Sequence, residues 1–559
     1  MRRLPFLSIR NNTENQQLCT VVGFPYYNNK LYVLLVPIRK NHRYSSVICI
    51  GKKQDKCFLL RYNGGNLQNS RLAKKYASCV QAGAAQRGND HIMRQYNPVT
   101  PEVVTALQAV VGEKYVKTDA ETLDKYKLDE NLDPTFWRLP EVVVSAGSTE
   151  EIAKIMQIAN QYGVPVTPRS AGTSVSCGAI PTYHGIVLLL ERMNRILEIN
   201  EEGMYMVVEA GVRTIDIQNL AHEKGLMYAG DPCSSDSCLI GGNLATNAGG
   251  NKAVRYGTTR HQVYSVEVVL PNGKVTTLGA TLKKCSTGFC LDQLIIGSEG
   301  TLGIITKATL KLVPLAPYKL DVLAVFTDLA KATALVPKLV KAGLNPTSVE
   351  FMDNNFVRSA SDYSDLKLPH YEDGCYDIVS IETFNEDELD DKMEKLSAIC
   401  EECGATDVLE ADDRVWQVRR NCLESTRSLS EVQTSEDLVV PVTKIADCIQ
   451  ALVKESKQYD FRVFCLAHAG DGNLHFQILR CDMSDAEWER QLEEFRHTAY
   501  RYVYDLGGRL SGEHGIGMKR VCYMEEYTDP VELELMKTIK GAMDPNWVLN
   551  PGKVFHPAE

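Results

Sequence analysis

The sequence predicts an α+β protein with two principal domains, and three observations support that fold class. A chain of 559 residues is too long for one ordinary hydrophobic core. Between residues 136 and 314, β-rich segments alternate with helical ones or follow one another directly. Beyond Pro317 the order becomes a split βαβ pattern of the ferredoxin-like kind. We therefore expect one domain at 136–314 and a second at 315–559, after a helical segment at 93–135.

The first 92 residues differ in charge from the rest of the chain. They contain fifteen Lys or Arg against three Asp or Glu, a net charge of +12, whereas the other residues contain 46 against 68, a net charge of −22. No helix or strand periodicity is sustained up to Met93, so we interpret residues 1–92 as a basic N-terminal extension that is not part of the fold. The acidic remainder would repel phosphate backbones, and we expect no nucleic-acid partner.

The cysteine pattern and the apolar runs are the sequence features that indicate the protein's cellular compartment. Seventeen cysteines are scattered without a repeated spacing, and residues 1–10 lack the apolar stretch of a signal peptide. We therefore expect reduced thiols in a cytoplasmic protein. The longest apolar run near the start, LYVLLVPI at residues 31–38, is too short to cross a bilayer. We therefore expect that the chain is not an integral membrane protein.

The first domain is expected to open with a helix and to continue with strand, helix and strand. Thr100 and Pro101 suit the N-cap and first turn of the opening helix. EVVVSA at 141–146 is β-rich, and the next helix begins after Ser148 and ends at Gly163. Further strands are expected at residues 164–168, 185–191, 205–212, 263–278 (a hairpin about Asn272-Gly273) and 303–315.

The second domain is expected to begin with a split βαβ pattern of ferredoxin-like order and to end with a helical part. The predicted elements are strands at 319–326, 347–353 and 376–384, helices at 329–343 and 387–404, a helix around Trp416, a hairpin at 465–479 and a long helix at 485–508. The segment SGEHGIGMKR follows that long helix.

Three glycine-rich loops in the first domain predict a nucleotide site. PRSAGTSVSCGA (168–179) directly follows a strand, a second loop spans residues 231–260, and GSEGTLGIIT (297–306) leads into a strand. Glycines let the backbone approach a ligand, and adjacent hydroxyl and N–H groups suit a phosphate. One such loop is often a plain turn, but three would line a groove for an extended dinucleotide. Neither a GxGxxG turn between strand and helix nor a Walker A motif is present.

A second candidate site centres on CLAHAGDGNLHFQIL, residues 465–479. A two-residue Asp-Gly turn would place His468 opposite His475, with Cβ atoms about 4.5–5.5 Å apart, which suits two imidazoles on one divalent ion. Solvated or core-packed histidines would give the same pattern. In SGEHG, Glu513 offers a third ligand, and two histidines with one carboxylate leave positions open, as catalytic metal sites do.

The three loops, in this order, resemble the flavin domain of the vanillyl-alcohol oxidase / p-cresol methylhydroxylase superfamily. More narrowly they resemble its D-lactate/glycolate dehydrogenase branch, from about Asn97 to the end. The resemblance implies a PCMH-type FAD-binding domain followed by a ferredoxin-like α/β substrate (cap) domain, of the FAD-linked oxidase C-terminal type, with a C-terminal helical part. The residues that it implies for FAD binding are Arg169, Ser170, Ala171, Gly172, Thr173, Ser174, Pro232, Ser235, Gly241, Gly242, Asn243, Thr246, Asn247, Gly249, Gly250, Gly257, Glu299, Gly303 and Ile304.

The first loop departs from the family in a way that bears on the flavin linkage. Ser170, Ala171 and Cys177 stand where relatives often have glycine. Covalent members attach the flavin through His or Cys near this loop. Because Ser170 and Ala171 cannot form that bond, we expect non-covalent FAD.

The resemblance also assigns roles in the second domain. His468, His475 and Glu513 fall on the metal ligands of the 2-hydroxyacid dehydrogenases, and Zn, Fe(II) or Mn would fit such a site. His514 falls on the proposed general base, Arg419 on an arginine that grips the substrate carboxylate, and Asn473 on a residue that contacts the substrate or the metal ligands. The implied reaction is hydride transfer from a D-2-hydroxy acid to flavin, with metal-assisted deprotonation of the hydroxyl.

The substrate is expected to be a small monocarboxylate. Ser435 stands where the D-2-hydroxyglutarate enzymes place a lysine for the distal carboxylate, and the adjacent Glu436 and Asp437 would disfavour a second carboxylate. We therefore predict D-lactate first, giving pyruvate, and glycolate second. D-2-hydroxyglutarate dehydrogenase and an oxygen-using 2-hydroxyacid oxidase are the alternatives within the class.

Two other classes remain open. A flavin-free metallohydrolase would use the His-His-Glu site but leaves the three glycine-rich loops unexplained. A non-catalytic paralogue is disfavoured because Arg419, His468, His475, Glu513 and His514 are all present. The chain has no appended cysteine cluster, so we expect the electrons to pass to a separate acceptor: an electron-transferring flavoprotein pair, an Fe–S subunit or quinone.

Overall fold

The computed structural model describes residues 20–23, 32–40, 43–51, 58–63 and 94–557, and the chain divides into two compact units, residues 1–91 and 92–559. In the first unit the described residues form a four-stranded antiparallel sheet in sequence order. Its strands are β1 (Thr20–Gly23), β2 (Tyr32–Lys40), β3 (Arg43–Gly51) and β4 (Phe58–Asn63). The interpretation of residues 1–92 as an extension outside the fold stays a prediction.

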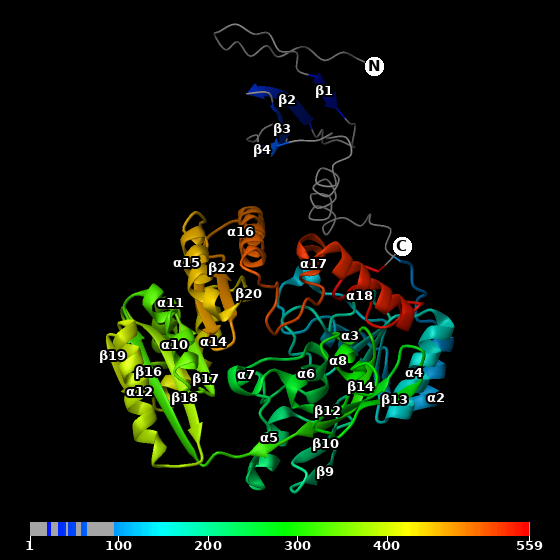
Figure 1. The fold of residues 1–559 in the computed structure, drawn as a ribbon. Coiled ribbons are helices and arrows are strands. Elements are labelled where there is room, and N and C mark those ends of the chain that lie inside the picture. Colours follow the sequence, from blue (N-terminus) through cyan, green and yellow to red (C-terminus); the bar gives the residue numbers. More distant parts are fainter. Residues whose placement is uncertain (1–19, 24–31, 41–42, 52–57, 64–93, 558–559) are drawn as a thin grey trace. The chain divides into compact units, whose positions relative to one another are not determined.

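The second unit begins with a small sheet covered by helices. The sheet has the order β5-β6-β8-β7, in which β6, β8 and β7 run parallel. Helices α2 and α4 pack together beside it (Figure 1). The elements are α2 (Pro101–Val111), β5 (Val116–Lys117), α3 (Ala120–Lys125), β6 (Val142–Ser145), α4 (Thr149–Tyr162), β7 (Val166–Arg169) and β8 (Ile186–Leu189), with 3₁₀ turns at Glu113–Tyr115 and Pro134–Phe136.

Local capping explains where the first two long helices start and stop. Thr100 Oγ1 accepts the Val103 N–H at the start of α2, and Ser148 accepts the Glu151 N–H at the start of α4. Gly163 ends α4 in the left-handed region, at φ +66°. These predicted helix boundaries are confirmed.

A five-stranded antiparallel sheet follows, in the order β13-β12-β14-β10-β9. Its strands are β9 (Ile196–Asn200), β10 (Tyr205–Glu209), β12 (Val263–Val269), β13 (Val275–Gly279) and β14 (Ile304–Lys311). The accompanying elements are α5 (Thr214–Glu223), β11 (Leu226–Met227), α6 (Ile240–Thr246), α7 (Ala253–Tyr256), the 3₁₀ turn Thr259–Gln262, α8 (Leu291–Ile295) and β15 (Val313–Pro314). The predicted hairpin about Asn272-Gly273 joins β12 to β13 and is confirmed.

The third sheet carries the second half of the unit. Its seven strands are all paired antiparallel, in the order β19-β16-β18-β17-β21-β22-β20. The strands are β16 (Tyr318–Phe326), β17 (Ser348–Met352), β18 (Cys375–Thr383), β19 (Asp407–Glu410), β20 (Gln433–Val439), β21 (Arg462–His468) and β22 (Asn473–Leu479). Strands β16, β17, β18 and β19 are the first four of this sheet in chain order. Numbered 1 to 4, they lie side by side in the order 4-1-3-2, as in a ferredoxin-like sheet, which confirms the predicted split βαβ order.

The helices of this half are α9 (Leu329–Ala332), α10 (Leu335–Lys341), α11 (Asn354–Ser364), α12 (Glu388–Cys403), α13 (Asp413–Arg420), α14 (Cys422–Leu429), α15 (Ile445–Ser456), α16 (Asp485–Asp505), α17 (Val521–Tyr527) and α18 (Pro530–Met543). A 3₁₀ turn at Val442–Lys444 precedes α15. The single helix predicted at 329–343 is two short helices. Pro337 explains the break, because a residue without an N–H is tolerated in a first helical turn and not in a helix interior. Helix α11 was not predicted.

The end of the chain returns to the first half of the unit. Val548 and Leu549 are buried in the same apolar cluster as α2, α4 and the small parallel sheet. The Asn550 N–H donates to the Val166 carbonyl at 2.7 Å. The C-terminal residues therefore pack on the small sheet rather than on the seven-stranded one. Among the described residues, no helix combines the length and the apolar character that a membrane crossing needs.

Candidate active site

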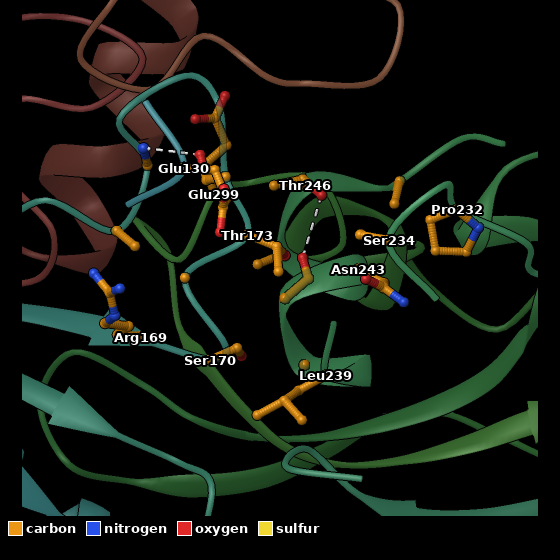
Figure 2. A pocket seen from close by; sticks show the side chains of 18 of the residues that line it. Glu130, Arg169, Ser170, Thr173, Pro232, Ser234, Leu239, Asn243, Thr246 and Glu299 are labelled. Atoms are coloured by element: carbon orange, nitrogen blue, oxygen red, sulfur yellow. Dashed lines mark hydrogen bonds between the residues drawn. The ribbon is translucent and has the colours of Figure 1, made fainter. Parts of the chain in front are cut away.

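All three glycine-rich loops line one cavity of about 480 Å³ in the second unit (Figure 2). The predicted cofactor residues that line it are Arg169, Ser170, Gly172, Thr173, Ser174, Pro232, Gly241, Gly242, Asn243, Thr246, Glu299, Gly303 and Ile304. Glu513 and His514 line the same cavity. The sequence motifs far apart in the chain are thus brought to one enclosed space.

The glycines in this cavity stand where a side chain would collide with a neighbouring residue. Gly172 has φ +79°, and a Cβ there would lie 2.1 Å from the Arg169 guanidinium. A Cβ on Gly241 would lie 2.8 Å from the Cβ of Ala210. The cavity is thus formed by closely packed glycine-rich segments with hydroxyl side chains such as Ser170, Thr173 and Ser174, which suits an extended phosphate-containing cofactor and fits FAD.

Six predicted cofactor residues do not line the cavity: Ala171, Ser235, Asn247, Gly249, Gly250 and Gly257. Some of them make contacts between the segments that surround the cavity. The side-chain oxygen of Asn247 accepts the Thr258 hydroxyl at 3.0 Å and the Arg260 N–H at 2.9 Å. A Cβ on Gly250 would lie 2.0 Å from the Asp231 carbonyl oxygen, and one on Gly249 would lie 2.7 Å from Glu513. These glycines bring neighbouring segments close, and their contact with a cofactor stays a prediction.

The predicted metal ligands converge beside the cavity. His468 Nε2 lies 3.4 Å and His475 Nε2 3.2 Å from Glu513 Oε1, and the three donor atoms all lie within 4.8 Å of one another. Two ligands about 2.0–2.1 Å from one tetrahedral ion stand about 3.3–3.4 Å apart, so the separations match a shared cation. His468 Nε2 is buried and has no hydrogen-bond partner, as expected of a nitrogen that faces a metal site.

The register of the hairpin differs from the prediction. His468 pairs with Asn473 and His475 with Leu466, because the turn has four residues, 469–472, instead of two. His475 therefore lies two residues diagonally from the position opposite His468. A displacement of two residues keeps the side chain on the same face of the sheet, and the two imidazole centroids are 5.3 Å apart.

Each histidine ligand faces a buried carboxylate on the neighbouring strand. Glu350 of β17 is opposite His468, and its Oε1 lies 2.8 Å from His468 Nδ1. Asp437 of β20 is opposite His475, with its Oδ1 3.8 Å from His475 Nδ1. The Glu350 contact is close enough to orient the His468 imidazole so that its Nε2 faces Glu513, whereas Asp437 is beyond hydrogen-bond distance of His475. The sequence analysis missed the role of Glu350; a lone charge inside the apolar strand TSVEFMD was the available signal.

The charges of this cluster depend on one another. Burial would raise the pKa of Glu350, but the charges of His468 and Arg419 outweigh it and hold the pKa of Glu350 below its usual value. Burial would lower the pKa of His468, but Glu350 and Glu513 raise it well above the ordinary range. The anionic surroundings thus favour a cation at His468, whether a proton or a metal ion.

His514 lies next to the proposed ligands with one ring nitrogen free. Its ring stacks on His475 with centroids 5.0 Å apart, and its Nδ1 is buried without a hydrogen-bond partner. Burial lowers the pKa of His514 to about 4, although Asp437 at 3.8 Å opposes the shift. The imidazole is therefore neutral near pH 7 and able to accept a proton.

Arg419 and Asn473 contact the carboxylates that flank the histidines. Arg419 donates from Nε at 3.2 Å and from Nη2 at 2.7 Å to Glu350 Oε2. Asn473 Nδ2 donates to Asp437 Oδ1 at 2.6 Å and to the Leu438 carbonyl at 3.0 Å. Neither side chain lines the cavity, so their contacts with a substrate stay predictions.

The acidic pair next to Ser435 is divided between two environments. Asp437 faces the histidines, whereas Glu436 is buried against Arg496, with Nη2 2.7 Å from Oε1. The argument that Glu436 disfavours a second carboxylate is therefore weakened, since its charge is neutralised. Helix α14 contributes Leu423, Glu424 and Arg427 to the cavity, and the sequence analysis did not identify them because no motif marks them.

Comparisons with known proteins agree with this architecture. Residues 140–279 match the model of an FAD binding domain, and residues 317–554 that of the FAD linked oxidases, C-terminal domain. The chain is 37% identical over 472 residues to a D-lactate dehydrogenase of Anaerostipes hadrus, which spans 83% of this chain and 99% of that protein. It is 35% identical over 427 residues to glycolate oxidase subunit GlcD of Bacillus subtilis (strain 168), covering 76% and 90%.

Solved structures share the fold at lower identity. p-Cresol methylhydroxylase with substrate bound superimposes with a TM-score of 0.67 at 17% identity, over 83% of this chain and 99% of that one. The 4-ethylphenol oxidase from Gulosibacter chungangensis gives 0.68 at 20% identity, over 83% and 99%.

The fold and the cavity thus define an FAD-linked oxidoreductase. The chain belongs to the family of FAD-linked oxidases that includes D-lactate dehydrogenase and glycolate oxidase subunit GlcD. The resemblance and the fold class expected from the sequence are confirmed.

Proposed function

We propose that the chain oxidises a small D-2-hydroxy acid to the 2-oxo acid, with D-lactate as the first candidate and glycolate as the second. One observation carries the proposal: the glycine-lined cavity that fits FAD also contains Glu513 and His514. A hydroxy acid held at the histidine cluster would therefore have its reacting carbon next to the cofactor. The names of the relatives from Anaerostipes hadrus and Bacillus subtilis support the same substrate class.

FAD is proposed to bind without a covalent bond. Ser170 and Ala171 offer no suitable nucleophile in the first loop. The thiol of Cys177 is buried, its pKa is raised by burial, and it does not line the cavity. Bound FAD supplies an acceptor for the two electrons of the substrate C–H bond.

A divalent metal is proposed at His468, His475 and Glu513. Two imidazoles and one carboxylate suit Zn, Fe(II) or Mn, and the free Nε2 of His468 supports the assignment. A metal ion bound there supplies polarisation of the substrate hydroxyl.

His514 is proposed as the general base that receives the hydroxyl proton. Its ring is neutral, and the residue lines the cavity. For Arg419 the proposed role is to bind the substrate carboxylate through Nη1, which lies outside the pair with Glu350. Asn473 is proposed to contact the substrate or the metal ligands.

A monocarboxylate fits the cavity better than D-2-hydroxyglutarate. Leu423 presents an apolar surface to the cavity, and Arg427 is paired there with Glu424 at 2.6 Å. The pairing of Arg427 with Glu424 leaves that cation less available for a distal carboxylate, and the smaller acid is therefore preferred in the proposal. The protein is proposed to be cytoplasmic, and its electrons are proposed to pass to a separate acceptor: an electron-transferring flavoprotein pair, an Fe–S subunit or quinone.

The test is anaerobic addition of D-lactate, glycolate and D-2-hydroxyglutarate to the purified protein while the visible flavin bands are followed. Bleaching by D-lactate at the lowest concentration is expected, with stoichiometric metal found by elemental analysis. More efficient bleaching by D-2-hydroxyglutarate would contradict the substrate assignment. Rapid reoxidation by air would favour the oxygen-using oxidase.

A further inference from the structure

The segment that carries Glu513 and His514 has no regular structure of its own. Residues 511–519 form neither helix nor strand. The directions of the two side chains therefore depend on what holds the loop backbone. From the seven-stranded sheet, Asp437 Oδ2 accepts the N–H groups of Gly512 at 3.1 Å, Glu513 at 3.1 Å and His514 at 2.8 Å. This fixes the loop on one side only.

The FAD-binding half holds the other side through Glu299. Its Oε1 accepts the Ile516 N–H and its Oε2 the Gly517 N–H, both at 2.7 Å. Glu299 belongs to the third glycine-rich loop and lines the cavity (Figure 2). Both carboxylate oxygens are thus bonded to the backbone directly after His514.

Ser176 of the first glycine-rich loop adds a second contact from the same half. Its hydroxyl donates to the His514 carbonyl at 2.8 Å. Its own carbonyl accepts the N–H groups of Met518 at 3.1 Å and Lys519 at 3.2 Å. Two of the loops that line the FAD cavity therefore contact the loop that carries the metal ligand.

The sequence of the loop accommodates these contacts. Gly515 has φ +81°, and a Cβ there would lie 2.9 Å from the Glu299 carboxyl carbon. Gly517 has φ +54°, and a Cβ there would lie 1.9 Å from the Ser176 carbonyl oxygen. A residue with a side chain at either position would push the FAD-binding half away from the loop.

We propose that Glu299 is a positioning residue that holds the 511–519 loop so that Glu513 and His514 face the cavity, an inference that rests on the proposed function. Glu299 acts through backbone N–H groups and does not itself contact the substrate. A carboxylate accepting two N–H groups makes strong charge-assisted bonds. The position of the metal ligand in the second half is thereby set from the cofactor loop of the first half.

Glu299→Gln tests the role because the amide keeps the size of the side chain but leaves one N–H facing an NH₂ group. The Zn²⁺ affinity of the FAD-loaded variant would be measured by chelator competition. A loss of about 10–100-fold is expected, since residues that orient metal ligands have effects of that size. The flavin-to-protein ratio is measured on the same preparation, because Glu299 also lines the FAD cavity, and Zn²⁺ affinities are compared at equal FAD loading. A Zn²⁺ affinity within twofold of wild type would overturn the proposal.

Two further variants complete the design. Glu202→Gln, at an exposed glutamate of the same half, controls for the loss of one negative charge and should leave Zn²⁺ affinity unchanged. Ser176→Ala removes the bond to the His514 carbonyl and should weaken Zn²⁺ binding in the same direction, by less. If Glu299→Gln does not fold, an unchanged affinity in Ser176→Ala overturns the proposal.

Amide hydrogen exchange of residues 511–519, measured without metal, separates this inference from the proposed function. Faster exchange in Glu299→Gln than in wild type supports the positioning role, whereas equal exchange contradicts it. If the wild-type protein neither binds Zn²⁺ nor oxidises a hydroxy acid, the proposed function fails. The exchange result still decides whether Glu299 orders the loop.

Discussion

The FAD cavity and the histidine cluster meet in one space but are built differently. The cavity is lined by residues of the three glycine-rich segments, which pack closely at glycines such as Gly172, in a loop, and Gly241, in α6. The cluster combines side chains on four neighbouring strands, β17, β21, β22 and β20, with Glu513 and His514 of the 511–519 loop. One site therefore depends on small residues where segments pack closely, and the other on the lateral alignment of strands.

The difference matters for how each site tolerates change. In the cluster, Glu350 lies opposite His468 and Asp437 opposite His475, so each ligand has its own carboxylate across the ladder. Removing one group there leaves a buried partner charge. In the cavity, adding one methyl group is the damaging change. Variants in the two regions should accordingly separate metal binding from FAD binding.

His514→Ala should have the largest effect and should leave both binding sites intact. Loss of a general base lowers the rate of flavin reduction by D-lactate about 10²–10⁴-fold. The rate is measured by anaerobic stopped flow, with FAD content and Zn²⁺ affinity measured on the same preparation. A near-normal rate of reduction would exclude His514 as the base.

Glu350→Gln should weaken metal binding at the histidine cluster and leave FAD binding unchanged. The variant loses the charge that orients His468 and pairs with Arg419, and metal affinity should fall about 10–100-fold. Chelator competition with Zn²⁺ gives the affinity, and the flavin spectrum reports the cavity. Glu410→Gln, at an exposed position of β19 in the same sheet, is the control. Equal metal affinity in the two variants would contradict the orienting role of Glu350.

Gly172→Ala should weaken FAD binding in the cavity and leave metal binding at the histidine cluster unchanged. The alanine must adopt φ near +79°, at a cost of about 1–2 kcal/mol, and its Cβ meets the Arg169 guanidinium. We expect FAD affinity to fall about tenfold, measured by fluorescence titration of the apoprotein, while Zn²⁺ affinity stays within twofold. Gly225→Ala has the same kind of backbone angle, φ +65°, with nothing within 4 Å of the added Cβ, and should retain FAD. Weaker FAD binding in both variants would assign the effect to backbone strain alone.

The contrast also explains what the sequence could predict. Glycine-rich loops are visible in the sequence because the residue type itself is the feature, and thirteen of the nineteen predicted FAD residues line the cavity. The proposed ligands His468, His475 and Glu513 were chosen by residue type and motif, and their binding of a metal stays a prediction. Their convergence needed the fold, because Glu513 reaches the hairpin from a loop beyond helix α16.

Relations between strands were the part that could not be predicted. The register of the β21–β22 hairpin depends on a turn of four residues where an Asp-Gly pair suggested two. Because the error was an even number of positions, the two histidines remained on one face. Glu350 and Asp437 became visible as partners only when β17 and β20 were placed beside the hairpin. Pairing between distant strands is set by tertiary packing, which local patterns do not report.

A residue remote from both sites gives the baseline for this comparison. His497 on α16 lies between Glu493, with Nε2 3.2 Å from Oε1, and Glu526, with Nδ1 3.5 Å from Oε2. Burial would lower the pKa of His497, but the two carboxylates outweigh it and raise the pKa to about 9. The protonated imidazole should therefore stabilise the fold below pH 6.5, its ordinary pKa in the unfolded chain, and lose that contribution as the pH rises through 9.

His497→Gln should consequently lower the free energy of unfolding at pH 6 by about 1 kcal/mol, a value reduced for the partial exposure of the pair, and should have no effect at pH 10. Urea unfolding at both values measures the difference. A deficit that persists at pH 10 would mean that packing of the ring, and not its charge, is what α16 gains from His497. The FAD and Zn²⁺ affinities of His497→Gln should equal those of the wild-type protein. This variant is therefore the reference against which changes in affinity at the two sites are judged.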